Sequence, residues 1–168
     1  MILVCPLSRL QESVDEIRAR HVVTLVRDES RVFRPRGIEP DDHLWLKMDD
    51  IAEPIDGYLA PAQEHVEALV TFLDRWDRKQ PLVIHCFAGI SRSTAAAFIS
   101  ACALSPKSDE AEIAMRLRAA SRTASPNSRL VALADDFLGR RGRMKAAIAK
   151  IGSGDFTEEA VPFRLKLD

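Results

Sequence analysis

A cysteine and an arginine stand six positions apart in the run His85-Cys86-Phe87-Ala88-Gly89-Ile90-Ser91-Arg92-Ser93. An apolar stretch, 82–84, precedes this run and an alanine-rich stretch, 94–104, follows it, so the sequence predicts a strand, a tight loop and a helix start. The backbone N–H groups of such a loop converge on an anion, and the helix dipole adds partial positive charge at the same point. The run is therefore predicted to enclose one phosphate group.

The side chains of this run supply the chemistry for a nucleophilic attack on phosphorus. Arg92 grips two phosphate oxygens through its planar fork, a geometry that lysine lacks. The same positive field favours the thiolate of Cys86, which is the nucleophilic form of cysteine. Ser93 is placed to donate its hydroxyl to the sulfur, and Gly89 allows the bend of the loop. His85 is interpreted as an organiser of the loop, because an ionised thiol needs no base.

This run resembles the signature of the protein tyrosine phosphatase superfamily, in which His-Cys is followed by five residues and then by Arg and Ser or Thr. Gly89 and the ending Ser91-Arg92-Ser93 are most similar to the dual-specificity subclass. The resemblance implies a phosphatase with a phosphocysteine intermediate, in which Cys86, Arg92 and Ser93 are catalytic. It also implies that the phosphate is bound by the P-loop residues Phe87, Ala88, Gly89, Ile90, Ser91 and Arg92.

Two other interpretations of the run stay open. A buried Cys86 would pack as a small apolar side chain, as free cysteines commonly do. A sulfur-transfer loop similar to that of rhodanese also wraps a cysteine in backbone amides. Such a loop needs no arginine six positions after the cysteine and no serine after the arginine, so Arg92 and Ser93 favour the phosphatase.

A carboxylic acid is expected opposite the nucleophile, because an alkoxide or phenoxide leaves phosphate slowly without a proton on its oxygen. The family takes this Asp from an upstream loop, and residues 46–50 resemble its strand-then-Asp arrangement. Asp50 matches that position if an insertion lies between residues 51 and 60. Asp49 is the alternative. Asp56 is also a candidate, because its separation of 30 positions from Cys86 is suitable, but it is better explained as a turn residue before Gly57.

No metal ion or cofactor is expected, because Arg92 and the loop amides neutralise the charge that Mg²⁺ handles in other phosphoryl-transfer enzymes. The chain has three cysteines, and their spacing indicates neither a zinc site nor a disulfide framework. Cys5 lies in an apolar strand and Cys102 in an apolar helix, so both are predicted to be core residues.

The expected substrate is a phosphorylated protein or peptide. The side chains between Cys86 and Arg92 include no lysine or arginine, whereas family members that act on phosphoinositides often carry lysines there. The chain is also far shorter than the large tyrosine-specific enzymes and lacks their Trp-Pro-Asp loop, which suggests a shallow pocket open to phosphotyrosine and also to phosphoserine or phosphothreonine. A lipid or inositol phosphate, or a catalytically idle phosphate-binding module, remains as the alternative.

The composition sets broad limits on the protein class. The 168 residues suit one domain, and a formal net charge of −1 does not indicate a nucleic-acid or acidic-membrane binder. No apolar stretch is long enough to span a membrane, and the first seven residues are too short for a signal sequence. A cytoplasmic protein is therefore expected, and the pattern leaves its oligomeric state open.

Strand and helix patterns alternate along the chain, which predicts a compact α/β domain. We expect a central, mostly parallel sheet flanked by helices, with the phosphate-binding loop between a central strand and a helix, as in tyrosine phosphatases. The phosphatase domain is expected over residues 1–151, and residues 152–168 as a C-terminal tail packed on it. The expected strands are 2–5, 21–26, 43–48 and 82–84, and the expected helices are 7–19, 61–78, 94–104, 109–121 and 127–151.

Overall fold

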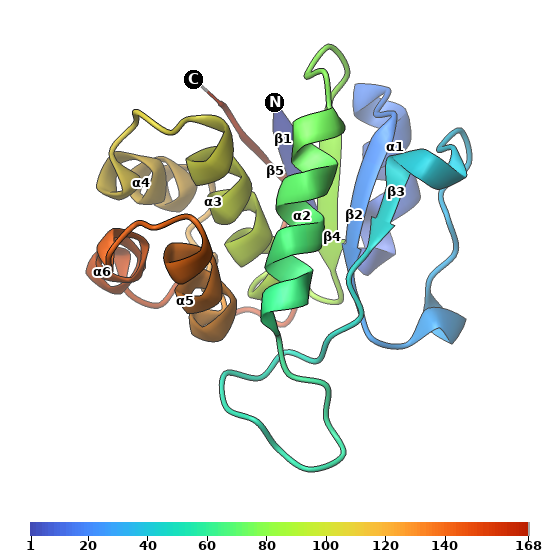
Figure 1. Cartoon of the computed structure of the whole chain (residues 1–168). Coiled ribbons are helices and arrows are strands. Elements are labelled where there is room, and N and C mark those ends of the chain that lie inside the picture. Colours follow the sequence, from blue (N-terminus) through green and yellow to red (C-terminus); the bar gives the residue numbers. More distant parts are fainter. Residues whose placement is uncertain (168) are drawn as a thin grey trace.

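In residues 1–167, which the computed structural model describes, four parallel strands and one antiparallel edge strand form the central sheet (Figure 1). The order across the sheet is β3-β2-β4-β1-β5. Strands β1, β2, β3 and β4 are mutually parallel, and β5 runs antiparallel to β1. The strands are β1 Ile2–Pro6, β2 His21–Leu25, β3 His43–Trp45, β4 Leu82–Cys86 and β5 Phe163–Leu165.

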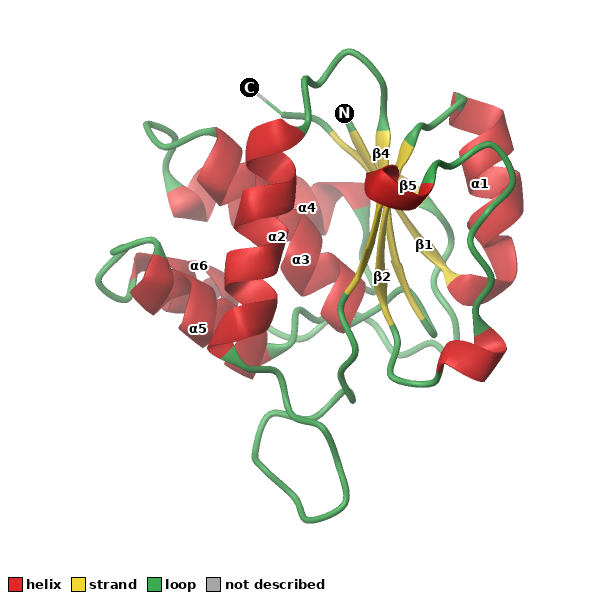
Figure 2. Ribbon diagram, turned by 45° about the vertical axis from the view of Figure 1, so that its right-hand side comes forward, coloured by secondary structure: helices red, strands yellow, loops and turns green. Residues whose placement is uncertain are grey.

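Helices cover both faces of this sheet (Figure 2). Helix α1 packs on one face, and α2 to α6 gather on the other. The predicted α/β fold, with a mostly parallel sheet flanked by helices, is confirmed. The helices are α1 Leu10–Ile17, α2 Gln63–Arg75, α3 Arg92–Leu104, α4 Glu110–Ala120, α5 Ser128–Phe137 and α6 Arg143–Ile151, with short 3-10 turns at Leu7–Arg9, Glu29–Arg31 and Pro40–Asp42.

The strands are mostly apolar because helices cover both faces of the sheet. Every residue of β1 and of β4 is buried. The larger core lies between the sheet and α2 to α6, and the smaller core lies beneath α1. Helix α3 is buried on nearly all sides, which explains its run of alanines and other small residues. The central strand and the helix that follows it are thus the most enclosed pair in the fold.

The structure corrects the ends of several predicted elements. The helix predicted over 127–151 is two helices, α5 and α6, because Gly139, Arg141 and Gly142 take positive φ values of 63°, 54° and 87°. A right-handed helix cannot continue through such a turn. The strand predicted over 43–48 ends as a strand at Trp45, and the helix predicted over 61–78 is shorter at both ends, as α2.

The segment after α6 contributes to the sheet, which the sequence pattern did not indicate. Strand β5 pairs with β1 so that Leu165 lies opposite Ile2 and Phe163 lies opposite Val4. The last residue of the predicted tail, Asp168, lies outside the described residues. None of the helices in residues 1–167 combines the length and the apolar character needed to cross a membrane.

Candidate active site

The run 85–93 connects the central strand β4 to the start of α3. Cys86 is the last residue of β4 and Arg92 is the first residue of α3. Because β2, β3 and β4 are parallel, the loops that follow them meet at one edge of the sheet, the lower edge in Figure 1. Ligand sites of open α/β sheets lie at this edge. The loop after β3, which carries Asp49 and Asp50, lies at the same edge.

Residues 87–91, here called the phosphate loop, have four of their five backbone carbonyls hydrogen-bonded to the surrounding protein. In the part of the chain that the structure describes, the N–H groups of this loop donate to no protein acceptor. Successive unpaired N–H groups of this kind form an anion-binding nest, and the N-terminus of α3 adds its dipole to it. These carbonyls accept four bonds from three segments: Leu7 N to Phe87 O (3.1 Å), Ala160 N to Ala88 O (2.9 Å), Ser125 N to Ile90 O (3.0 Å) and Asn127 N to Ser91 O (3.3 Å).

Gly89 permits the close packing of the phosphate loop against the end of β1. Its φ of 73° lies in the left-handed region, which glycine adopts at little cost. An added Cβ atom would lie 2.8 Å from the backbone nitrogen of Pro6 and 3.0 Å from the carbonyl carbon of Cys5. Both the backbone conformation and the lack of space therefore require glycine at this position.

Cys86 and Ser93 lie together at the base of the phosphate loop. The Cys86 Sγ atom is 3.1 Å from the Ser93 Oγ atom, and both residues are buried. A hydroxyl at this distance can donate to a thiolate and stabilise its charge. The arrangement therefore places a hydrogen-bond donor on the sulfur, as the predicted role of Ser93 requires.

The Arg92 guanidinium is anchored at one nitrogen and keeps another nitrogen without a hydrogen-bond acceptor among residues 1–167. Its Nη1 atom donates to the carbonyl oxygen of Met48 at 2.9 Å, which anchors the side chain to the loop after β3. Its Nε atom is buried, has no hydrogen-bond partner, and lies 3.7 Å from Asp50 Oδ2. A phosphate oxygen would supply the missing acceptor. The anchoring carbonyl of Met48 was not predictable from the sequence pattern.

Asp50 lies next to the phosphate loop. Its Oδ1 atom accepts hydrogen bonds from the Ser91 hydroxyl at 2.7 Å and from the Asn127 side-chain amide at 2.9 Å. The Oδ2 atom faces Arg92 Nε and accepts no hydrogen bond among residues 1–167. The structure therefore brings Asp50, Ser91 and Arg92 into one cluster.

Asn127 links Asp50 and Ser91 of this cluster to the start of α5. Its backbone N–H binds the carbonyl of Ser91, its side-chain amide binds Asp50, and its side-chain oxygen caps α5 through Leu130 N at 3.0 Å. The expected helix start at residue 127 agrees with the observed cap, and Asn is a favoured capping residue. Its contact with the carboxylate across the site was missed.

Asp49 has a different set of partners from its neighbour. Its Oδ2 atom accepts bonds from Arg27 Nη1 and from Leu59 N, both at 2.7 Å, and its own N–H donates to Leu59 O. Although desolvation opposes it, the bonds from Leu59 and Arg27 lower the pKa of Asp49. Asp49 therefore closes the stem of the loop 51–60. Asp56 lies exposed in that loop beside Gly57, whose φ is 83°.

A buried polar chain supports the histidine of the run. The Thr24 hydroxyl lies 2.7 Å from His85 Nε2 on one side and 2.7 Å from His43 Nε2 on the other. Burial lowers the pKa of His43 to about 4 and that of His85 to about 3, so both rings are neutral at pH 7. The sequence places His43 at the start of the expected strand 43–48 and indicates no partner for it. The structure instead makes it part of this chain, stacked on Trp45.

The predicted phosphate-binding side chains differ in exposure. Gly89 and Arg92 are buried, whereas Ala88, Ile90 and Ser91 are partly covered. Phe87 is 53% exposed and is the one large apolar side chain that the loop presents to solvent. These side chains contribute no positive charge apart from Arg92, so the positive field at the loop comes from its backbone N–H groups and from Arg92.

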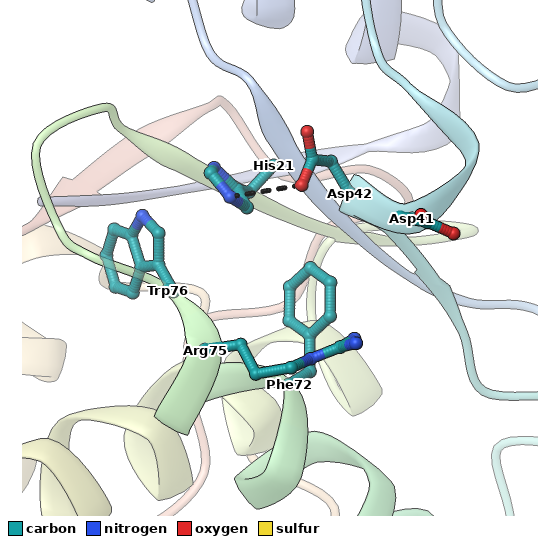
Figure 3. Close-up of a pocket in the computed structure, with 6 residues that line it drawn as sticks. All are labelled: His21, Asp41, Asp42, Phe72, Arg75 and Trp76. Carbon is teal, nitrogen blue, oxygen red and sulfur yellow. Dashed lines mark ion pairs between the residues drawn. The ribbon is translucent and has the colours of Figure 1, made fainter.

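A separate hollow lies at the other end of the strands (Figure 3). His21 is the first residue of β2, so this hollow is at the edge opposite Cys86. Its volume is about 140 Å³, and the His21 ring lies 3.4 Å from Asp42. It contains no nucleophile. In residues 1–167 no group of three or more His, Cys, Asp and Glu side chains is arranged to hold a metal ion.

No family model matches the sequence, and no curated protein matches it. Solved structures do resemble it. The PTP-2 phosphatase of Cydia pomonella superposes with a TM-score of 0.63 at 22% identity, over 80% of this chain and 84% of that one. Human DUSP28 has a TM-score of 0.64 at 14% identity, over 89% and 94% of the two chains. PTPMT1 in complex with PI(5)P has a TM-score of 0.58 at 18% identity, over 89% and 94%.

The chain has the fold of the dual-specificity and tyrosine phosphatases. This dual-specificity phosphatase fold was predicted from the run 85–93, and the likeness extends over most of the length of each protein compared. At these identities the likeness concerns the fold. The function therefore has to be argued from the site itself.

Proposed function

We propose that this protein is a phosphatase that hydrolyses phosphomonoesters through a phosphocysteine on Cys86. The observation that carries the proposal is the convergence of three groups on one anion nest. The Cys86–Ser93 pair lies at its base, the Arg92 guanidinium lies beside it, and Asp50 lies across it. A buried structural cysteine would need none of these neighbours.

The first step transfers the phosphoryl group to the enzyme. The Cys86 thiolate attacks phosphorus in line, the sulfur–phosphorus bond forms, and the bond to the leaving oxygen breaks. Arg92 and the loop amides hold the equatorial oxygens, where charge is spread in the transition state. Asp50 Oδ2, the oxygen without a hydrogen bond, delivers a proton to the leaving group.

The second step returns the enzyme to its starting state. Asp50, now a carboxylate, takes a proton from a water molecule, whose oxygen attacks phosphorus. The sulfur–phosphorus bond breaks and inorganic phosphate forms. The Ser93 hydroxyl donates to the departing sulfur across the 3.1 Å contact, so the thiolate leaves as a stabilised anion. Asp50 keeps the proton for the next cycle.

A phosphorylated protein or peptide is the proposed substrate, with phosphotyrosine favoured and phosphoserine or phosphothreonine allowed. The phosphate loop carries no cation before Arg92, and its exposed side chain is the apolar Phe87. A lipid phosphate is the second candidate, because PTPMT1, which has the same fold, was solved in complex with PI(5)P. We also propose a cytoplasmic location, which rests on the sequence expectation.

Turnover of p-nitrophenyl phosphate in the presence of a chelator tests this proposal. We expect full activity without added metal and inhibition by vanadate, because Arg92 and the loop amides supply the positive field. A protein that binds phosphate but never turns the substrate over would be a binding module and would contradict the proposal. A panel of phosphopeptides, phosphoinositides and inositol phosphates then ranks the substrate classes.

A further inference from the structure

A groove leads away from the proposed active site along the start of α5 and the side of α6. It consists of two hollows of about 460 and 470 Å³ that share Ala52, Ser128, Ile148 and Ala149. The first hollow begins at Asp50 and Ser91, the cluster beside the phosphate loop. The two hollows therefore form one groove that is continuous with the site.

The half of the groove nearest the site, here called the polar half, mixes polar residues with Ala52, Pro126, Ile148 and Ala149, and Asp50 is the one charged residue among those that line it. Four serine side chains and the backbone around Gly152 line it. The hydroxyls of Ser128 and Ser153 are exposed and make no hydrogen bond to residues 1–167. The Ser125 hydroxyl already has a partner, because its Oγ atom accepts a hydrogen bond from Gly154 N at 2.9 Å. Free hydroxyls in this position suit the N–H and C=O groups of an extended polypeptide.

The far half is apolar with charges at its rim. Val131, Ala132, Ile148 and Ala149 form its floor, and Glu53 and Lys145 stand beside them. Lys145 is exposed and forms no ion pair with residues 1–167. Arg129 is less available, because its Nε atom donates to Pro61 O at 2.7 Å. Lys145 is thus the cation that the groove offers to a ligand.

The walls of the groove are held in place before any ligand binds. The buried carboxylate of Asp135 in α5 accepts hydrogen bonds from Gly142 N, Met144 N and Lys145 N, at 2.5, 2.7 and 3.2 Å. These bonds tie the first turn of α6 to α5. Arg118 donates to Gly152 O at 2.8 Å and fixes the end of α6. Binding to a preformed groove loses little conformational entropy of the protein, because the walls are already ordered.

We propose that this groove binds the polypeptide that flanks the phosphorylated residue of the substrate. An apolar side chain of that segment fills the far half, and an acidic side chain pairs with Lys145. The inference rests on the proposed function and narrows its substrate to a class of phosphopeptides. Polypeptide fits better than lipid, because the polar half lies between the phosphate loop and the apolar half, whereas an acyl chain would meet serines first.

Filling the apolar half is the first test. Ala149→Phe places a large side chain in the part that both hollows share, and Ala146→Phe is a matched control on the same helix outside the groove. The readout is the ratio of kcat/KM for a phosphotyrosyl peptide to kcat/KM for p-nitrophenyl phosphate. The peptide carries a leucine and a glutamate close to the phosphotyrosine on either side. We expect Ala149→Phe to lower the ratio about tenfold, the scale of one lost apolar pocket, and Ala146→Phe to leave it unchanged.

Charge reversal is the second test. Lys145→Glu should lower kcat/KM for the glutamate peptide about threefold and raise it for the same peptide with lysine in that place. Lys150→Glu makes the same charge change on α6 outside the groove and should not alter the preference. The inference would be overturned if the preference for the glutamate peptide over the lysine peptide did not change in Lys145→Glu, or if it changed equally in Lys150→Glu.

A binding measurement separates failure of the groove from failure of the proposed function. If the wild-type protein hydrolyses neither substrate, the proposed function is wrong. Fluorescence anisotropy, which measures binding of the labelled phosphopeptide to the intact protein, then still tests whether the groove binds the peptide. Weaker binding by Ala149→Phe than by Ala146→Phe supports it, and equal binding overturns it.

Discussion

The phosphate loop and the loop that carries Asp50, residues 46–60, lie at the same edge of the sheet but are held by different means. Backbone N–H groups from three distant segments bind carbonyls of the phosphate loop. The 46–60 loop depends on side chains: Asp49 closes its stem with Arg27, and Asn127 holds Asp50. The proposed anion site is therefore held by backbone bonds, whereas the proposed acid is held by a few replaceable side chains.

Substitution of Asp50 should give the largest effect in this comparison. Asp50→Asn keeps the shape of the side chain but removes the proton, so kcat on a phosphotyrosyl peptide should fall about 10²–10⁴-fold. The loss should shrink for an aryl phosphate whose leaving group is a weak base, because such a group needs little protonation. Steady-state kinetics on the two substrates measure this.

Asp49 and Asp56 provide built-in controls for that experiment. Asp49→Asn weakens the loop stem, and Asp56→Asn changes an exposed turn, so neither should show the leaving-group dependence. If Asp49→Asn alone showed it, the first carboxylate of the pair would be the acid. If none of the three did, the acid would lie elsewhere.

Substitution of Arg92 tests the phosphate-loop side of the comparison. Arg92→Lys keeps the charge but loses the fork that lies between Met48 O and the nest, so kcat/KM should fall about 10²–10³-fold, as when an oxyanion donor is removed. The loss should be similar for good and poor leaving groups, since the arginine acts on the equatorial oxygens. A loss below about tenfold would contradict bidentate capture of phosphate.

The three cysteines should differ in reactivity although all are about 1% exposed. Burial raises the pKa of Cys5 and of Cys102 to about 12, so both stay protonated at neutral pH. Cys86 has the Ser93 hydroxyl and the anion nest beside it. Iodoacetamide at about pH 6 should label Cys86 first, and inorganic phosphate should protect it. Equal labelling of the three, measured by peptide mass spectrometry, would argue against a thiolate at Cys86.

The smallest effect is expected from the buried histidines behind the loop. His43 ionises near pH 4 in the folded protein and near 6.5 in the unfolded chain, so the unfolded state binds more protons between these values. The free energy of unfolding should therefore fall as the pH drops from about 6.5 to 5. His43→Gln should flatten that slope in urea titrations. An unchanged slope would show that His43 is not buried as a neutral ring.

The sequence predicts what depends on local order. The run 85–93 indicates its strand, loop and helix start because the apolar pattern and the glycine are contiguous in the chain. Asp50 was predicted as the acid, with Asp49 as the alternative, because it follows the expected strand 43–48 closely. Both predictions rest on neighbours within a few positions.

The contacts that complete the site could not be predicted in this way. Met48 O binds a side chain 44 positions away, and Asn127 reaches Asp50 across 77 positions. Such pairs depend on how the helices pack, and no local pattern encodes that packing. In the sequence Thr24 is an ordinary strand residue. Only the pairing of β2 with β3 and β4 brings the two imidazoles to its hydroxyl.

The phosphocysteine itself is the most direct test of the proposed mechanism. An aryl phosphate is mixed with the protein, the reaction is quenched with acid at short times, and the digested peptides are weighed by mass spectrometry. The mechanism predicts one phosphoryl group on the peptide that contains Cys86, and neither this adduct nor turnover in Cys86→Ser. A phosphoryl group on another residue, or turnover that survives Cys86→Ser, would contradict it.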